Sequence, residues 1–373
     1  MKGFNKMNKK ISVITIHSIR NYGSALQTYA TQEKFKSYNF DVEIVNFIRT
    51  GCFDKNKIKD KNKIKYLICG LLKWHLIFLI AFLKKRFVFS RFLKKYINLT
   101  PNLYTCDEDF EKQPIEADVY CTGSDQIWNS YYNGGILKPF FLSYAPDNKI
   151  KISYAASIGK SELEPFEIEK TKELLSRYDG ISVREKSAVN IIKKLGISDP
   201  ICTLDPTLVM SKQFWLNFAG KRKIKKPYYL VYQLNENKEL DTYIEMLKRE
   251  KNIDIYRVYL TFFRRYNRTG KIIIAPKVQD FVNVIAYADC VITDSFHGTA
   301  FSINLNKNFI SIFPSSFSTR IGSLLELTSL EYKHLQNYDD FSIIDKQIDY
   351  DKVNNIFDLE RKKVDAFLDK YLR

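Results

Sequence analysis

The chain has 373 residues, 45% of them hydrophobic, so it can form a substantial core, and its length favours two domains over one. Its formal net charge of +17 is concentrated, because 13 lysines and arginines but only one acid lie between Lys55 and Lys95. A general nucleic-acid binder would carry basic residues on several elements, so we expect no nucleic-acid partner.

The sequence gives no indication of export or of metal binding. Residues 11–16 (ISVITI) have the pattern of a buried strand, and no small-residue cleavage site follows them, so we expect no signal peptide. The six cysteines are scattered without a CxxC pair, which favours free thiols in a reducing cytoplasm. We expect no metal, because no compact group of His, Asp and Glu occurs.

The first half of the chain alternates strands with helices. A predicted strand at 11–16 is followed by a glycine-bearing loop, a helical segment (ALQTYATQEKFKSY) and a second strand at 41–47. This βαβ pattern indicates a parallel sheet. Short apolar strands that end in polar loops recur at 117–128, 151–159 and 178–196.

A second alternation begins after a break. Residues 202–210 contain Pro206 and, with the basic stretch that follows, predict a connection between domains. Strands and helices are then predicted in turn at 228–234, 237–250, 254–260, 279–288, 290–294 and 297–306. Two consecutive α/β halves indicate two Rossmann-like domains that face each other across a cleft.

We therefore predict an N-terminal Rossmann-like domain at 10–204 with a helical insertion at about 55–97, a C-terminal Rossmann-like domain at 205–345, and a C-terminal helical tail at 346–373. Ligands of such sheets bind at the carboxyl ends of the strands. Four side chains that suit a binding site stand at predicted strand ends: His17, Ser124, Arg184 and His297.

The insertion at 55–95 is basic and apolar at once. Residues 66–83 are strongly apolar, but Lys73 and His75 interrupt them, which makes a membrane-spanning helix a weak prediction. A basic, aromatic-rich helical region fits better into the surface of an anionic membrane. A solvated helical hairpin packed on the first domain is the alternative.

Seven short segments carry a resemblance to a known family. They are spaced from near the start of the chain to residue 330, and their order is specific. The segments are HSIRNYGSALQTYA (17–30), DVYCTGSDQIWN (118–129), SYAASIG (153–159), ISVREKSA (181–188), LDPTL (204–208), ITDSFHGTAFSI (292–303) and TRIGSLLELTSL (319–330). Together they resemble the polysaccharide pyruvyl transferase family.

The resemblance implies a fold like that of two-domain, GT-B-type glycosyltransferases. It also implies transfer of a pyruvyl group from phosphoenolpyruvate to two hydroxyls of a sugar, which gives a cyclic ketal and phosphate. The acceptor would be a lipid-linked or nucleotide-linked sugar of a surface or capsular polysaccharide precursor. We expect a cytoplasmic enzyme without a cofactor, in peripheral contact with the inner membrane face.

Two residues in the matching segments suit this chemistry. Arg184 follows a predicted strand and precedes a helix, so it is a candidate to hold the phosphate or carboxylate of the donor. His297 follows Asp294 at the start of a helix, and the resemblance implies that it is the key histidine, most simply a general acid or base. A helix N-terminus favours the neutral imidazole and an anion nearby.

Ser295 departs from the commoner family pattern. Many members have arginine at this position, two residues before the histidine, whereas serine can donate a hydrogen bond to phosphate but supplies no charge. Arg320 precedes another predicted helix and is a candidate replacement, as are Arg264 and Arg265. The missing charge therefore bears directly on which donor the chain binds.

The first-domain loop HSIRNYGS offers further candidates. Asn21 and Gly23 suit a tight turn, and Gly23 and Ser24 would bring backbone amides close to a ligand. The loop lacks the GxGxxG pattern, so a dinucleotide site is unsupported. His17 is either a second acid/base or acceptor contact, or a structural residue.

The loop GSDQIW, at 123–128, places Ser124, Asp125 and Gln126 after a strand. Asp125 either orients a sugar hydroxyl or caps a helix. Trp128 has the right chemistry to stack on a sugar, although a core position is the simpler interpretation. His75 and His334 have no supporting context.

Two other functions remain open from the sequence. The first keeps the fold and changes the donor, giving a GT-B glycosyltransferase that uses a nucleotide sugar. The second is a non-enzymatic protein that binds anionic membrane or nucleic acid through residues 55–95.

Overall fold

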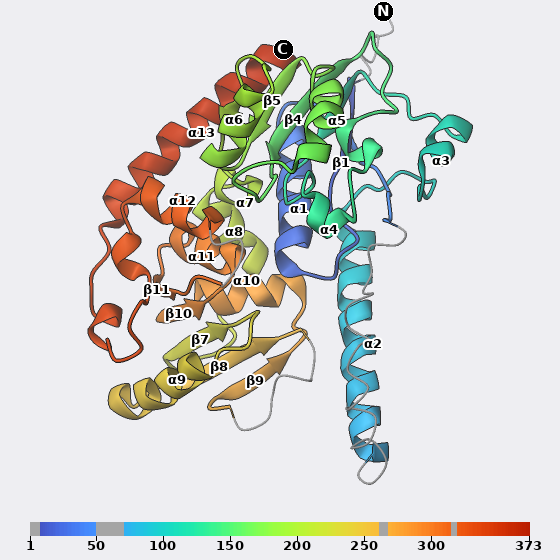
Figure 1. Cartoon of the computed structure of the whole chain (residues 1–373). Coiled ribbons are helices and arrows are strands. Elements are labelled where there is room, and N and C mark those ends of the chain that lie inside the picture. Colours follow the sequence, from blue (N-terminus) through green and yellow to red (C-terminus); the bar gives the residue numbers. More distant parts are fainter. Residues whose placement is uncertain (1–7, 50–70, 261–267, 315–318) are drawn as a thin grey trace, which may run out of the picture.

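The computed structural model describes residues 8–49, 71–260, 268–314 and 319–373 (Figure 1). In the helix at Leu71–Tyr96, the side chains are described from Leu79 onward. The described chain forms two separate parallel sheets with helices packed around them. The predicted α/β architecture of two Rossmann-like domains is therefore confirmed.

The first sheet has six strands in the order β2-β1-β3-β4-β5-β6, all parallel where they pair. Its strands are short and nearly all buried, as expected for a sheet covered by helices on both faces. They are β1 (Lys10–Ile14), β2 (Asp41–Ile44), β3 (Val119–Thr122), β4 (Ile150–Ala156), β5 (Gly180–Val183) and β6 (Ile201–Cys202).

The helices that accompany this sheet follow the predicted alternation. They are α1 (Tyr22–Lys36), α2 (Leu71–Tyr96), α3 (Asp107–Lys112), α4 (Ser130–Asn133), the 3-10 turn η3 (Lys138–Phe141), α5 (Pro165–Leu175), α6 (Lys186–Lys194), α7 (Pro206–Val209) and α8 (Lys212–Ala219). The last two form the connection that Pro206 predicted.

The second sheet has five parallel strands in the order β11-β10-β7-β8-β9. They are β7 (Tyr228–Tyr232), β8 (Asp254–Tyr259), β9 (Lys271–Ile274), β10 (Cys290–Thr293) and β11 (Asn308–Ser311). The helices around it are α9 (Lys238–Lys251), α10 (Val278–Ala286), α11 (Phe296–Asn304) and α12 (Thr319–Thr328), with 3-10 turns η4 (Glu331–Lys333) and η5 (Ser342–Ile344).

One apolar core continues from the first domain into the second. Trp215 of α8 is fully buried, donates its indole N–H to the carbonyl of Thr207, and packs edge-on against Phe301 with ring centroids 4.8 Å apart. The residues between the two sheets are thus part of the packed interior, which fixes how the two domains meet.

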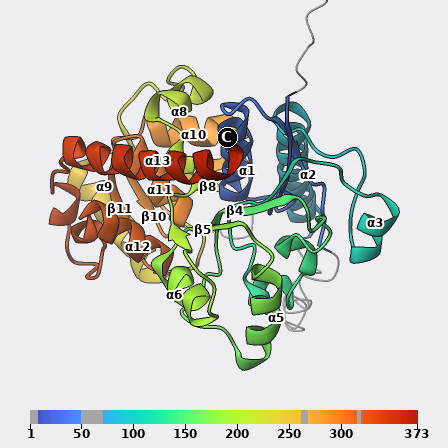
Figure 2. The ribbon, with the colours of Figure 1, turned by 90° about the horizontal axis from the view of Figure 1, so that it is seen from above.

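The last helix, α13 (Tyr350–Leu372), runs from the second domain back to the first (Figures 1 and 2). Arg361 donates to the side chain of Asn304 at 3.0 Å in the second domain. Asp365 pairs with Lys34 of α1, and the Tyr371 ring covers Gly180 of β5 in the first. The domain boundaries at 204/205 and 345/346 stay a prediction, since α13 contacts both domains.

The basic insertion contains one long helix, α2, which packs through Phe89 and Phe92 against the core. Residues 50–70, which include the first half of the predicted insertion, lie outside the described residues. Within the described part of the chain, no helix combines the length and apolarity that a membrane span needs. The interfacial position of this region stays a prediction.

Candidate functional site

Loops from both domains meet around one buried carboxylate. Arg184 follows β5, Asp125 follows β3, Asp205 precedes α7, and His297 is the second residue of α11. Arg184 lies within 4 Å of both Asp125 and Asp205, and His297 lies 3.8 Å from Asp205. We call these four residues the Asp205 cluster.

Asp205 is the charged centre of this cluster. One carboxylate oxygen accepts a hydrogen bond from Arg184 Nη1 at 2.5 Å, and the other accepts from the backbone N–H and the hydroxyl of Thr207. Burial alone would raise the pKa of Asp205, but Arg184, His297 and these hydrogen bonds lower it to about 2. The carboxylate is therefore ionised at neutral pH and fixes the Arg184 guanidinium.

His297 is buried, and its ring is wedged between the domains. A Cβ atom on Gly23 would lie 2.0 Å from His297 Nδ1, so the ring touches the first turn of α1, which Asn21 caps by accepting from Gly23 N–H. Burial lowers the pKa of His297 more than Asp205 and Asp125 raise it. The imidazole is therefore neutral at pH 7.

Because His297 contacts Gly23, we expect replacement of this helical glycine by alanine to destabilise the protein, whereas such a replacement usually stabilises a helix. Alanine normally stabilises a helix by about 1 kcal/mol relative to glycine, but here its methyl group would displace the imidazole. We expect Gly23→Ala to lower the free energy of unfolding by about 1–3 kcal/mol. The matched control is Gly322→Ala in α12, where the nearest atom is 3.7 Å away. If both variants changed the free energy of unfolding equally in denaturant titrations, the close contact between Gly23 and His297 would be contradicted.

Phe296 forms a platform for two guanidinium groups. The Arg184 guanidinium lies 4.7 Å from the ring centroid and that of Arg320, from α12, lies 5.7 Å from it. Burial lowers the pKa of Arg320, and the positive charge of Arg184 lowers it further. Two cations held against one ring favour an anion between them, because it would relieve their repulsion.

Several buried nitrogens of this group have no hydrogen-bond partner among the described residues: Arg184 Nε and Nη2 and Arg320 Nε, which are donors, and His297 Nε2. Unpaired buried donors are costly, so they mark a place where a ligand oxygen would be stabilised. Three carboxylates (Asp125, Asp205 and Glu185) are also close. An anion here would therefore be recognised by the direction of the donors and not by net charge.

The predicted first-domain residues join the cluster to different degrees. Asp125 has a positive φ of 76° and accepts from Ser24 Oγ at 2.7 Å, which ties the α1 turn to the cluster. Ser124 donates to Asp205 at 3.3 Å. Gln126 accepts from Asn129 and is buried beside them. These contacts position the loop after β3 against α1 and Asp205.

Ser295 and Asp294, which precede His297, both hydrogen-bond within the protein. Ser295 is the N-cap of α11 and accepts from Gly298 N–H at 3.3 Å. Asp294 turns toward the loop after β7, where it accepts from the backbone N–H groups of Leu234 and Asn235 and from the Asn235 side chain. Asp294 thus holds the loop after β7 in place.

Other predicted candidates lie elsewhere. The ring nitrogens of His17 are 3.3 and 3.4 Å from the oxygens of Thr15 and Asn46, and no contact with the Asp205 cluster is present among the described residues. Trp128 is a core residue that donates to the Phe140 carbonyl, and His334 stacks on Phe313. Arg264 and Arg265 lie outside the described residues, as does the side chain of His75.

The sequence interpretation missed three members of this site: Asp205, Phe296 and Glu185. Asp205 lies in LDPTL, one of the segments that carry the family resemblance. The Asp-Pro-Thr sequence could have indicated it, because this pattern is typical of a helix start with Asp205 as the N-cap and Pro206 as the first helical residue. Glu185 accepts from the backbone N–H groups of Ile158 and Gly159. It therefore connects the loop after β4 to Arg184.

A cavity of about 140 Å³ opens beside the cluster, and its lining includes Arg184, Asp205, Phe296 and Arg320. This places the cations and the carboxylate at a space large enough for a small ligand group. Among the described residues, no group of three or more His, Cys, Asp and Glu side chains could hold a metal ion.

Comparison with known proteins identifies a family. A family model described as polysaccharide pyruvyl transferase matches residues 21–316, which include every member of the Asp205 cluster. No curated protein sequence matches the chain significantly.

Several solved structures share its fold over nearly the whole length. A complex of Staphylococcus aureus MnaA with UDP has a TM-score of 0.55 at 12% identity, covering 98% of this chain and 97% of that one. The UDP-N-acetylglucosamine 2-epimerase from Rickettsia bellii has a TM-score of 0.54 at 13% identity, covering 98% and 97%. These are GT-B proteins, so the predicted GT-B-like fold is confirmed.

Proposed function

Because the chain belongs to the polysaccharide pyruvyl transferase family, we propose that it transfers a pyruvyl group from phosphoenolpyruvate to a sugar of a surface or capsular polysaccharide precursor. The observation that carries this proposal is the small cavity lined by Arg184 and Arg320, whose buried guanidinium groups keep N–H groups without a hydrogen-bond partner among the described residues, with His297 Nε2 3.8 Å from the adjoining Asp205 carboxylate. Such a site suits a compact donor that bears a phosphate and a carboxylate.

The reaction makes specific demands on these residues. Two acceptor hydroxyls form bonds to the central carbon of phosphoenolpyruvate, and the C–O bond to phosphate breaks. One of the two hydroxyl protons is balanced by the proton added to the methylene carbon, and the other leaves with the phosphate. Arg184 and Arg320 would hold the donor anion and stabilise the departing phosphate. His297 is neutral, so it is suited to take a proton from an attacking hydroxyl and to return one later.

Ser295 supplies no charge, and Arg320 offers a replacement for the arginine that is common there. It comes from a different helix but stands over the same Phe296 ring as Arg184. This supports phosphoenolpyruvate as the donor despite the serine.

The acceptor would approach from the first-domain side, where the Asn21–Ser24 turn meets Asp125. Asp125, which accepts from Ser24 and from the backbone N–H of Gln126, is the proposed acceptor of a hydrogen bond from a sugar hydroxyl. The acceptor is proposed to be a lipid-linked or nucleotide-linked sugar in the cytoplasm.

Donor binding tests the proposal directly. We expect phosphoenolpyruvate to raise the melting temperature of the protein, and Arg320→Gln to weaken this binding by roughly 10–100-fold through loss of a charge-assisted contact. Arg249→Gln is the matched control, since Arg249 is exposed on α9. Stabilisation by UDP-sugars alone would favour the nucleotide-sugar glycosyltransferase instead.

Turnover is then measured as phosphate release from phosphoenolpyruvate in the presence of a panel of lipid-linked and nucleotide-linked sugars. Sugar-dependent release is the expected result. If neither donor binds and no sugar gives turnover, a non-enzymatic binding function would replace this proposal.

A further inference from the structure

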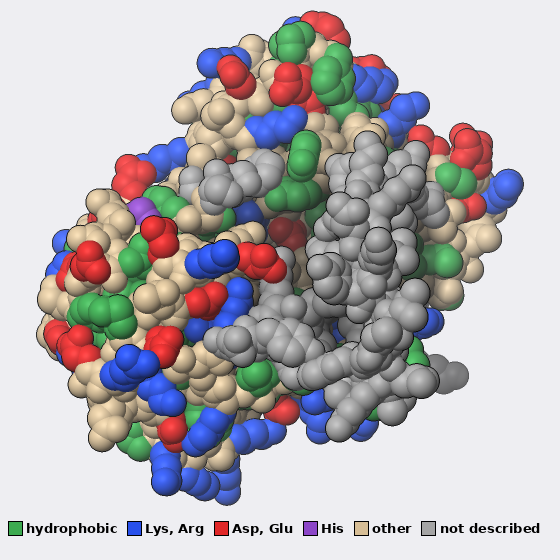
Figure 3. All heavy atoms as spheres, turned by 60° about the horizontal axis from the view of Figure 1, so that its bottom comes forward, with side chains coloured by type: hydrophobic (Ala, Val, Ile, Leu, Met, Phe, Trp, Pro, Cys, Tyr) green, Lys and Arg blue, Asp and Glu red, His purple; other side chains and the backbone are tan. Residues whose placement is uncertain are grey.

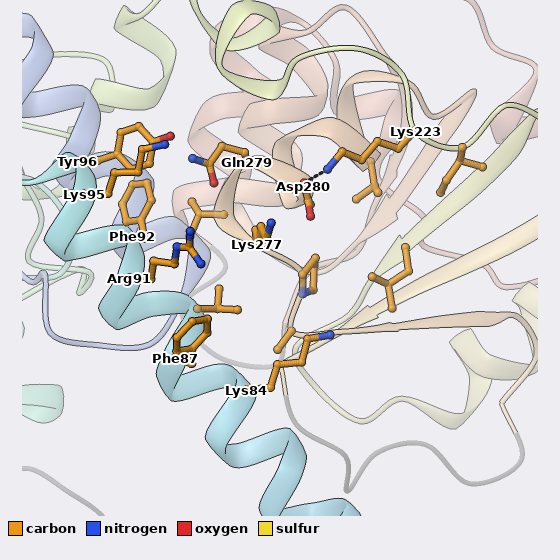
Figure 4. A pocket seen from close by; sticks show the side chains of 17 residues that line it. Lys84, Phe87, Arg91, Phe92, Lys95, Tyr96, Lys223, Lys277, Gln279 and Asp280 are labelled. Carbon is orange, nitrogen blue, oxygen red and sulfur yellow. Dashed lines mark hydrogen bonds and ion pairs between the residues drawn. The ribbon is translucent and has the colours of Figure 1, made fainter.

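A second cavity, of about 580 Å³, lies between α2 and the second domain (Figure 4). One wall is α2, and the other is formed by the end of β9 and the start of α10. Apolar side chains such as Val88, Phe92 and Val278 are buried at its base. We call this cavity the α2–α10 groove.

Cations surround this groove. Lys84 and Arg91 extend from α2 toward the opposite wall in Figure 4, where Lys277 is the residue directly before α10. The one acid of the lining, Asp280, is paired with Lys223. The cations of the lining without a carboxylate partner among the described residues are Lys84, Arg91, Lys95 and Lys277. These charges, next to a helix N-terminus, favour an anionic group.

A stripe of side chains on α2 leads into the groove. Leu79, Leu83, Phe87, Arg91 and Lys95 follow one another at intervals of four residues, so each lies next to the one before it, and the row winds around the helix by about 40° per step. The first three are 49%, 50% and 62% exposed, and the last two line the groove together with Phe87. The stripe is therefore apolar at one end and cationic at the other, as a ligand with an apolar chain and an anionic head requires.

Surface charge alone does not distinguish this place. On the face that Figure 3 brings forward, Lys and Arg side chains are mixed with Asp and Glu over the described surface. The α2–α10 groove differs because cations that lack a carboxylate partner among the described residues adjoin exposed apolar side chains on one helix.

We propose that the α2–α10 groove binds the phosphate of an anionic phospholipid at a membrane surface, with the acyl chains against Leu79, Leu83 and Phe87. Arg91, Lys95 and Lys277 contact the phosphate, and α2 lies along the lipid headgroups. The groove needs residues from both domains, so it is a site of the folded chain and not of the insertion alone.

The groove is connected to the Asp205 cluster through Tyr22. The Tyr22 hydroxyl donates to the Pro276 carbonyl at 2.7 Å, and its ring stacks on Phe281 of α10 with centroids 4.1 Å apart. The next residue, Gly23, touches His297. The first turn of α1 therefore joins the wall of the groove to the Asp205 cluster.

Vesicle co-sedimentation of the full-length protein tests this proposal. We expect binding to phosphatidylglycerol vesicles, little binding to phosphatidylcholine vesicles, and a loss of roughly tenfold or more in Arg91→Gln/Lys95→Gln/Lys277→Gln. Leu79→Ser/Leu83→Ser should weaken binding as well, because both side chains are exposed and their loss leaves the core intact. Unchanged melting temperatures would show that the variants fold.

The control variant also loses three positive charges, but on a part of the surface away from the groove. Lys172→Gln/Lys193→Gln/Lys194→Gln lies on α5 and α6, away from α2 in Figures 1 and 2, and should bind within about twofold of the wild type. An equal loss in this control would mean that net charge alone attracts the vesicles and would overturn the proposal. So would equal binding to phosphatidylcholine, no binding to either vesicle, or full competition by millimolar soluble glycerol phosphate.

Discussion

Replacing Asp205 with asparagine is expected to lower the free energy of unfolding by about 3–5 kcal/mol, although the side chain keeps its size. Asp205 is fully buried and accepts the 2.5 Å hydrogen bond from Arg184. Its loss leaves a buried guanidinium whose remaining carboxylates, on Asp125 and Glu185, are 3.8 and 4.0 Å away. Urea unfolding at pH 7 measures the change.

A smaller change at the same carboxylate is the control. Ser124→Ala removes only the 3.3 Å hydrogen bond to Asp205 and should cost about 1 kcal/mol. A double-mutant cycle with Arg184→Met isolates the pair, because the double variant should be destabilised by about 1–3 kcal/mol less than the sum of the two single variants. Strict additivity, or a loss below 1 kcal/mol in Asp205→Asn, would show that the ion pair does not hold this cluster together.

The same substitution should lower the affinity for phosphoenolpyruvate, since Asp205 fixes the Arg184 guanidinium against Phe296. Titration of the folded Asp205→Asn protein with phosphoenolpyruvate, below its unfolding transition, separates this effect from the loss of stability.

The fold was predictable because its signals are local. Short β-branched strands, each followed by a polar loop and a helix, indicate parallel sheets wherever they occur, and a break at Pro206 separates the two halves. The path of α13 was not predictable, because the contacts of Asp365 with Lys34 and of Tyr371 with Gly180 join residues far apart in sequence.

The site was predictable only in part. A residue that follows a strand must lie at the carboxyl edge of the sheet, but this position does not determine which way its side chain points. Arg184 and His297 both follow strands and do meet at Asp205, but Asp294 follows the same strand as His297 and turns toward Asn235. His17 also follows a strand, and its ring faces Asn46. The convergence of Arg320 needed the helix α12 to be placed against Phe296, which no local pattern contains.

The α2–α10 groove was also only partly predictable from the sequence. The charge and apolarity of α2 are plain in the sequence and suggest a membrane surface. Lys277 lies about 180 residues away from α2 in the sequence, and only the packing of the two domains brings it opposite Arg91.

His297→Asn is expected to reduce kcat/KM for sugar-dependent phosphate release by roughly 10²–10⁴-fold, the usual contribution of a general acid or base. Donor binding should change far less, because both arginines remain over Phe296. The matched control is His334→Asn, whose ring stacks on Phe313 outside the Asp205 cluster and should leave turnover within about twofold. Release that survives in His297→Asn at the wild-type rate would remove His297 from the catalytic assignment.

The pH profile gives a second readout that a structural role would not produce. Burial lowers the pKa of His297 below the ordinary 6.5, so the neutral base persists at pH 6.5 and is lost only as the pH falls through this lowered value. We expect kcat/KM of the wild type to keep its plateau below pH 6.5 and then to fall on the acid side. Asp205, with a pKa of about 2, stays ionised over that range and cannot cause the fall. The acid limb should therefore disappear in His297→Asn and persist in His334→Asn, and an unchanged limb in both would assign it to another group.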